Sequence, residues 1–204
     1  MTLIKPFSKL KREANKRNES IAGGGMWRAL DFLIYLVFVA LILISARAVL
    51  FDPVRVDGRS MLNTFRDDEI MLVDRTAYAF SGPKRGDVVI CYYPDDYYVS
   101  RDVAYASRVK RVVAVAGDVI FTENGVLYVN GEPVDEPYVS AENAGGAEIG
   151  SRETPVTVSE GCVFVLGDNR RESADSRRGD VGEIPLCRVA GKVRLVVYPK
   201  LRWA

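Results

Sequence analysis

One long apolar segment stands out against a series of short ones along the chain. Residues 29–51 read ALDFLIYLVFVALILISARAVLF, in which only Asp31 and Arg47 are charged. A helix needs about 20 residues to cross the hydrocarbon core of a bilayer. Both charges lie towards the ends of the segment, where their side chains can extend to the interface. The pattern therefore predicts one transmembrane anchor helix over residues 29–51.

Two other interpretations of this segment remain open. Its uninterrupted apolar part, residues 32–44, has the length of a signal-peptide core, and Ala46-Arg47-Ala48 resembles a small-residue cleavage site. A removable signal peptide would fit these features, although the polar stretch ahead of it is longer than usual. The third interpretation is a buried core helix. Length favours the anchor.

The segment ahead of the anchor is basic. Residues 1–28 carry seven lysines and arginines and a Gly23-Gly24-Gly25 break, without apolar periodicity. Positive residues next to a membrane span are retained on the cytoplasmic side. We therefore expect a cytoplasmic tail over residues 1–28, a single pass through the cell membrane, and an extracytoplasmic domain over residues 52–204.

That last part of the chain has the pattern of a β domain. Asn124-Gly125 and Asn130-Gly131 flank a short apolar run, as hairpin turns do. No helical period of comparable length occurs after Phe51, so the chain is predicted to be mainly β, with an all-β domain after the anchor. Residues 140–150 are expected to form an exposed excursion between strands. Its strand-like runs, rich in valine, isoleucine and tyrosine, are VRVDG, EIMLVDR, DVVICYY, RVKRVVAVA, DVIFT, VLYVNG, CVFVLGD and KVRLVVYP.

Composition narrows the chemistry. The chain contains no histidine, which excludes a Ser/His/Asp or Cys/His triad and any histidine-based zinc site. Its 28 basic and 27 acidic residues give no reason to expect a nucleic-acid partner. The cysteines Cys91, Cys162 and Cys187 lack CxxC spacing, so we expect no metal and no cofactor. Pairing of Cys162 with Cys187 stays open.

A serine nucleophile without histidine needs another base. A lysine can serve only when it is neutral, which requires its pKa to fall by roughly 3 units, or about 4 kcal/mol, through burial and neighbouring positive charge. Lys110 lies within the apolar run VKRVVAVA, where alternation puts it and Arg111 on opposite faces of a strand. Taken alone, such a pair also fits a strand edge or an ion pair.

Ser60 is the candidate nucleophile. It stands in DGRSMLNT, where a strand is expected to give way to a turn, so that its hydroxyl and amide can face a cleft. The other interpretation is that Gly58 and Asn63 simply form a turn.

Four segments in order resemble the conserved boxes of type I signal peptidases: GRSMLNTF, RGDVVICYYP, VKRVVAVAGDVI and GDNRRESADSRRGDVGEI. The resemblance implies a catalytic domain of coiled antiparallel sheets, with Ser60 as nucleophile and Lys110 as general base. It implies that the Ser173 hydroxyl bonds the lysine, and that Asp175 and Arg177 form an ion pair bracing the site. A surface salt bridge is the alternative for that pair.

The chain departs from the family pattern at one position that bears on catalysis. Gly58 stands where some members carry a serine that assists the oxyanion. We therefore expect the Ser60 amide to do more of that task, or a water or a second amide to join it.

The resemblance also implies a function: a membrane-bound serine endopeptidase that removes N-terminal signal peptides after Ala-x-Ala-like sites. A substrate strand would add beside the site, against Met61, Val56 and Val109, which fit an ordinary core equally well. The expected partners are preproteins, the lipid bilayer and a neighbouring secretion translocon. The alternatives are a related serine/lysine peptidase maturing pilin or another specialised exported substrate, and an inactive membrane-tethered β scaffold.

Overall fold

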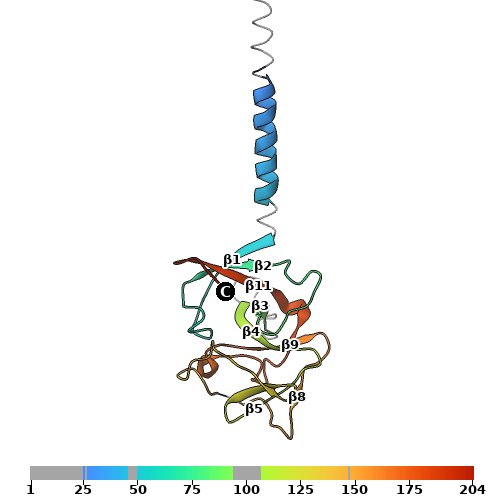
Figure 1. Cartoon of the computed structure of the whole chain (residues 1–204), viewed down its shortest axis with the longest axis vertical. Helices are drawn as coiled ribbons and strands as arrows, with labels where there is room; N and C mark the ends of the chain where they lie inside the picture. The colour runs from blue at the N-terminus through green and yellow to red at the C-terminus, as the bar shows by residue number, and fades with distance from the viewer. Residues whose placement is uncertain (1–24, 26, 46–49, 94–106, 147) are drawn as a thin grey trace, which may run out of the picture. The chain divides into compact units, whose positions relative to one another are not determined.

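The computed structural model describes residues 25, 27–45, 50–93, 107–146 and 148–204. The chain divides into two compact units, residues 1–48 and 49–204, and Figure 1 follows both along the sequence. The expected basic tail lies almost entirely outside the described residues, as does the Ala46-Arg47-Ala48 segment.

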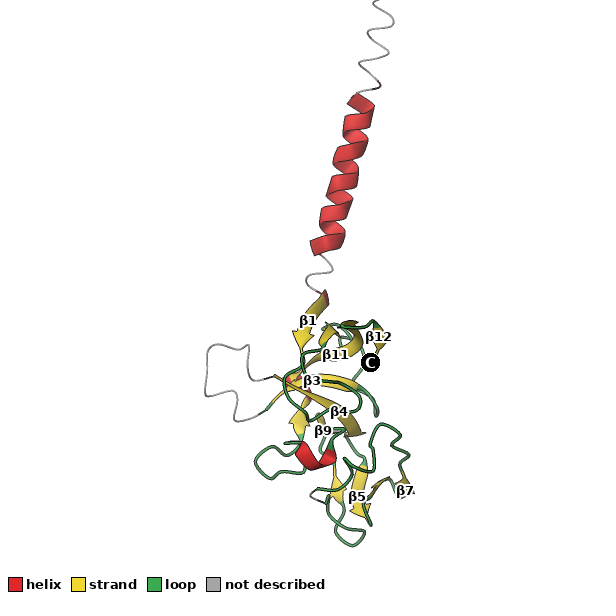
Figure 2. Ribbon diagram, turned by 90° about the vertical axis from the view of Figure 1, so that its left-hand side faces the viewer, coloured by secondary structure: helices red, strands yellow, loops and turns green. Residues whose placement is uncertain are grey.

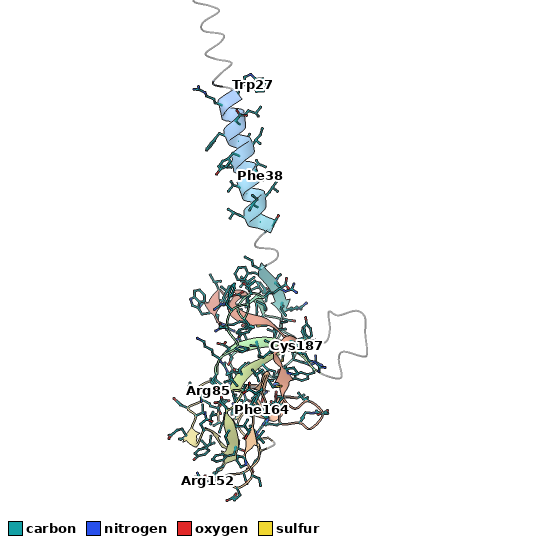
Figure 3. The ribbon with its side chains drawn as sticks, turned by 90° about the vertical axis from the view of Figure 1, so that its right-hand side faces the viewer. Trp27, Phe38, Arg85, Arg152, Phe164 and Cys187 are labelled. Carbon is teal, nitrogen blue, oxygen red and sulfur yellow. The ribbon has the colours of Figure 1, made fainter. Side chains whose placement is uncertain are left out.

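The first unit contains one helix, Trp27–Ser45, among its described residues. Its 19 residues have a mean hydropathy of 2.2, and it is long and apolar enough to cross a membrane. None of its most apolar stretch is buried, and Trp27 and Phe38 project outwards from it (Figure 3), so the core-helix interpretation finds no support. The helix includes residues ahead of the predicted start at 29, residues 46–49 lie outside the described part of the chain, and Phe51, expected in the anchor, begins β1 (Phe51–Arg55).

The second unit is mainly β, which confirms the predicted fold class. Its larger sheet is antiparallel throughout, with the strand order β1-β2-β11-β3-β4-β9-β10, and β12 pairs with β11. The strands are β1 (Phe51–Arg55), β2 (Ile70–Asp74), β3 (Val88–Tyr92), β4 (Ser107–Val115), β9 (Cys162–Leu166), β10 (Ile184–Pro185), β11 (Val189–Tyr198) and β12 (Arg202–Trp203).

A smaller antiparallel sheet follows β4 in the chain and lies beyond β9 in space (Figure 2). The Asn124-Gly125 and Asn130-Gly131 turns join its hairpins, and all four residues have positive φ angles, as two-residue hairpin turns require. Its order is β7 (Glu132–Pro133), β6 (Val126–Val129), β5 (Val119–Glu123) and β8 (Val156–Thr157); two short 3-10 helices, η2 (Arg170–Glu172) and η3 (Leu186–Arg188), lie outside the sheets.

Apolar side chains form three buried clusters. One packs Val56, Met61 and Phe65 against the inner face of β2 and β11, and another joins β4 and β9 to the small sheet. The segment 140–150 was expected to be an exposed excursion, but Ile149 is 3% exposed and belongs to the second cluster. Its carbonyl accepts a hydrogen bond from the Thr122 amide, which fastens the segment to β5.

The pairing of β4 bears directly on the candidate site. Ser107 to Arg111 pair with β3 along one edge, whereas β9 pairs with β4 only from Arg111 onwards. The second edge of residues 107–110 is therefore not covered by β9. Lys110 lies on this open stretch.

The three cysteines are free thiols in the structure, so the Cys162–Cys187 pairing left open above is not formed there. Cys91 is buried in β3 and belongs to the third cluster, and burial raises the pKa of its thiol to about 12.

Gly191 provides a test of the packing between β11 and β2. A Cβ atom there would lie 2.6 Å from the Asp74 carbonyl oxygen and 2.9 Å from Val73 Cγ1. We expect Gly191→Ala to lower the free energy of unfolding by about 1–3 kcal/mol, because a crowded core has to shift. Thermal unfolding would measure this. The matched control is Gly179→Ala, where no atom lies within 4 Å of the new Cβ; an equal effect of both substitutions would contradict the prediction.

Candidate active site

Ser60 lies on a tight turn that follows β1. The amides of Thr64 and Phe65 both donate to the Met61 carbonyl, at 3.1 and 2.8 Å. Met61 and Phe65 are 1% and 0% exposed, so their side chains fasten the turn to the core. The turn interpretation and the nucleophile interpretation of this segment are therefore compatible, since the turn leaves Ser60 half-buried at its start.

Lys110 meets Ser60 from the open stretch of β4. Its ammonium group, Nζ, donates to Ser60 Oγ over 2.7 Å and to the Val109 carbonyl over 3.0 Å. Lys110 is only 2% exposed. The two residues that the sequence singled out, fifty positions apart, are thus in direct contact.

Burial sets the protonation of this amine. Loss of hydration disfavours the charged form and lowers the pKa of Lys110 from 10.5 to about 8. The positive charge of Arg108 lowers it further, and the carboxylates of Asp175 and Asp168 oppose both effects. A substantial fraction of the amine is therefore neutral slightly above neutral pH, when it can accept the Ser60 proton.

The segment after β9 holds the backbone of the Ser60 turn. The Asn169 amide donates to the Ser60 carbonyl, and Asn169 Nδ2 donates to the Arg59 carbonyl, both at 3.0 Å. Asn169 also caps η2, since its side chain accepts from the Glu172 amide. In the sequence, this asparagine was recognised only as part of the segment GDNRRESADSRRGDVGEI, and no role was predicted for it.

A buried ion pair joins the same segment to β4. The Arg111 Nε and Nη2 atoms donate to the two carboxylate oxygens of Asp168 at 2.8 and 2.7 Å, with side-chain exposures of 11% and 1%. Thr64 Oγ1 also donates to Asp168, and the Tyr138 ring lies 3.9 Å from the guanidinium. Sequence reasoning placed Arg111 opposite Lys110 but did not find this partner, which lies 57 positions away.

Asp175 and Arg177 form a second buried pair. Arg177 Nε and Nη2 donate to Asp175 at 2.8 and 2.9 Å, with side-chain exposures of 6% and 0% for the arginine and the aspartate. A surface salt bridge, the alternative considered from the sequence, does not describe this geometry. Although burial alone would raise it, the pKa of Asp175 is lowered, chiefly by Arg177. Asp175 also accepts from the Gly167 amide at 3.1 Å.

The structure differs from expectation at Ser173. Its hydroxyl is buried beside Gly167 and makes no hydrogen bond to Lys110, whereas the resemblance implied one. The donors of Lys110 Nζ are directed at Ser60 and at the Val109 carbonyl instead. Ser173 nevertheless lies close enough to Asp175 to help lower the pKa of that carboxyl.

An open groove leads to the pair. This cavity of about 680 Å³ runs between β1 with its following turn and the first residues of β4. Ser60 and Lys110 line it together with Val56, Met61 and Val109, the three residues expected as walls. Gly58 lines it too, but its amide donates to Asp67 Oδ1 at 2.9 Å.

Among the described residues, no three cysteine, aspartate or glutamate side chains gather as a metal site would require. Asp168 and Asp175 are instead paired with Arg111 and Arg177.

The Arg111–Asp168 pair gives a prediction about stability. Arg111→Met should lower the free energy of unfolding by about 3–5 kcal/mol, because it leaves a buried carboxylate without its cation. Chemical denaturation near neutral pH would measure the loss. Arg75→Met is the control, since it breaks an exposed pair with Asp52 and should change stability little. Similar losses in both variants would contradict the argument.

The chain is similar in sequence to known proteins over most of its length. Residues 29–198 match the family described as "Signal peptidase, peptidase S26". Signal peptidase I of Bacillus licheniformis is 35% identical over 192 residues, which cover 92% of this chain and 94% of that protein. Signal peptidase I T of Bacillus subtilis (strain 168) is 34% identical over 168 residues, which cover 80% of this chain and 82% of that protein.

A crystal structure of a signal peptidase I from Enterococcus faecalis V583 is also similar. It has a TM-score of 0.42 and 27% sequence identity, and the match covers 54% of this chain and 95% of that one. The sequence matches extend over most of the chain, through the apolar helix and the β unit alike. The chain therefore belongs to the signal peptidase family, peptidase S26, a family of serine peptidases.

Proposed function

We propose that this protein is a membrane-anchored endopeptidase that removes N-terminal signal peptides from exported preproteins, with Ser60 as the nucleophile and Lys110 as the general base. The observation that carries the proposal is the 2.7 Å contact between Lys110 Nζ and Ser60 Oγ on the wall of an open groove. Membership of the signal peptidase family supports the reaction class.

The chemistry follows from the protonation of one amine. Neutral Lys110 accepts the Ser60 hydroxyl proton while Oγ bonds to the carbonyl carbon of the scissile peptide. The ammonium then returns the proton to the leaving nitrogen, the C–N bond breaks, and an ester on Ser60 remains. In the second half, Lys110 takes a proton from water, the resulting hydroxide adds to the ester carbonyl, and the proton returns to Oγ as the ester bond breaks.

The developing oxyanion needs hydrogen-bond donors in the turn. Gly58 carries no hydroxyl, and its amide already donates to Asp67. The Ser60 amide is therefore the donor that we assign to the oxyanion, as a backbone N–H at the nucleophile can be. A water molecule or a substrate-dependent movement of the turn would supply the second donor.

The groove suits an extended peptide. A substrate strand could pair with the edge of residues 107–110 that β9 leaves open, so that main-chain hydrogen bonds fix its register. Alternate substrate side chains would then face Val56, Met61 and Val109, which belong to or pack against one apolar cluster. The resemblance to signal peptidases implies that the side chains facing these walls are small, one and three positions before the cut, as in Ala-x-Ala.

The helix would tether the β unit to a membrane. The helix Trp27–Ser45 is suited to span the bilayer, and the seven basic residues ahead of residue 29 favour a cytoplasmic N-terminus. The β unit would then lie outside, close to where a translocated signal peptide emerges from the translocon.

The assignment of the two reacting residues can be tested on full-length protein in detergent with a secretory preprotein as substrate. Ser60→Ala and Lys110→Met should each lower kcat by at least about a thousandfold, because either change removes a reacting group. Gel analysis and mass spectrometry of the products would measure the rate and the cut. Ser159→Ala and Lys84→Met, at exposed positions, are controls that should retain activity.

Wild-type cleavage by either active-site variant would overturn the proposal. Cleavage of pilin-type precursors alone, with secretory precursors left intact, would instead support the specialised peptidase considered from the sequence.

The pH profile provides an independent test. The charged form of Lys110 cannot accept a proton, so kcat should rise as pH passes the lysine's pKa of about 8 and level off above it. Removing a nearby positive charge with Arg108→Gln should move the midpoint to higher pH, because Arg108 helps to lower that pKa. Initial rates between pH 6 and 10 would measure both. A profile that is flat over this range would contradict the role of Lys110.

A further inference from the structure

Gly167 lies directly behind the nucleophile. A Cβ atom on this glycine would lie 2.5 Å from the Ser60 carbonyl oxygen and 2.3 Å from Ser173 Oγ, so its backbone is in close contact with both. Two residues further on, the Asn169 amide donates to the same Ser60 carbonyl. Any displacement of residues 167–169 would therefore displace the Ser60 backbone.

Two side chains fix the peptide groups of Gly167, one on each side. Its amide donates to Asp175 Oδ2 at 3.1 Å, and Asp175 is in turn paired with Arg177. Its carbonyl accepts a hydrogen bond from Arg170 Nε, also at 3.1 Å. The first of these contacts involves the ion pair implied by the family motif. The second depends on Arg170, and the orientation of Arg170 depends in turn on a residue that lies outside the four motif segments.

That residue is Glu136, which follows β7 in the small sheet. Arg170 Nη1 and Nη2 donate to its two carboxylate oxygens at 2.9 and 2.5 Å, with side-chain exposures of 9% for Arg170 and 11% for Glu136. Such a two-point contact fixes the plane of a guanidinium, and here it leaves Nε directed at the Gly167 carbonyl. Tyr138 Oη donates to Glu136 as well, at 2.9 Å.

Tyr138 links Glu136 to the other side of the site. Its ring packs on the guanidinium of Arg111, which is paired with Asp168. Glu136 therefore contacts both the group that holds the Gly167 carbonyl and the residue that covers the Arg111–Asp168 pair.

We infer that Glu136 is a positioning residue for the Ser60–Lys110 pair: by orienting Arg170 it holds the Gly167 carbonyl, and through Gly167 it holds the backbone of Ser60. The inference rests on the proposed function of that pair. Without the carboxylate, the guanidinium of Arg170 loses its fixed plane and Nε no longer stays on the Gly167 carbonyl. The reacting oxygen and amine then lose alignment, while the groove that binds the peptide keeps its walls.

The test is a kinetic comparison of full-length variants in detergent on one preprotein. Glu136→Gln keeps the size of the side chain and removes its charge. It should lower kcat by about tenfold, since small misplacements of reacting groups are costly, and should leave KM within about twofold of wild type. Glu123→Gln is the matched control, because it also removes a carboxylate of the small sheet that is paired with an arginine, Arg152, and that pair is exposed.

Arg170→Lys is the second variant. It keeps the positive charge and can still pair with Glu136, but it cannot contact the carboxylate and the Gly167 carbonyl with one rigid group. It should therefore lower kcat as Glu136→Gln does, and the double variant should lose little more than either single one, because all three break the same contact. A purely structural ion pair would tolerate Arg170→Lys and would show its effect in the melting temperature instead.

The outcomes are distinguishable from failure of the proposed function. If Ser60→Ala keeps its activity, the proposed function is wrong. If Ser60→Ala is inactive but Glu136→Gln and Arg170→Lys both match Glu123→Gln in kcat, the inference about Glu136 is overturned. Should Glu136→Gln fail to fold, as judged by thermal unfolding, Arg170→Lys decides alone.

Discussion

The dehydration of one lysine side chain is the constraint on which the site depends. Burial brings the pKa of Lys110 from 10.5 to about 8, and each unit of such a shift corresponds to about 1.4 kcal/mol. The unfolded chain, whose lysine has the higher pKa, binds more protons than the folded chain between these two pH values. Stability should therefore rise with pH across that window, because the folded state disfavours the ammonium form. The protein is thus less stable at neutral pH than at a pH above the ordinary pKa of lysine, as far as this one group is concerned.

The surrounding charges are arranged so that this neutral amine can persist. Arg111, the neighbour of Lys110 on the opposite face of β4, is compensated by Asp168, and Asp175 is compensated by Arg177. A carboxylate left without its arginine near Lys110 would stabilise the ammonium and raise the pKa. The buried ion pairs thus do more than connect the segment after β9 to the core. They limit the negative potential at the amine while holding the backbone on which Ser60 depends.

The sequence predicted those features that a local pattern encodes. Short runs rich in valine, isoleucine and tyrosine located the strands, the Asn-Gly pairs located the hairpins, and the burial of Lys110 followed from an apolar run around it. Contacts between distant segments were not accessible in this way. Asp168 pairs with Arg111 across 57 positions, and Glu136 pairs with Arg170 across 34. Nothing in the sequence distinguished these carboxylates from the many others that could have paired with either arginine. Ser173 shows a second limit of sequence-based prediction. The motif identified the residue but did not determine which hydrogen bond its hydroxyl makes.

The open edge of β4 has a consequence for the protein before it meets any substrate. Unpaired strand edges attract the strands of other molecules and are a common origin of aggregation. A peptidase that receives its substrate as an added strand cannot close this edge permanently. Here the stretch that β9 leaves unpaired is only four residues long and carries the charged Arg108, features that discourage stable pairing with a second copy. Because this edge is short and charged, it disfavours self-association, although the same edge would still accept a preprotein strand.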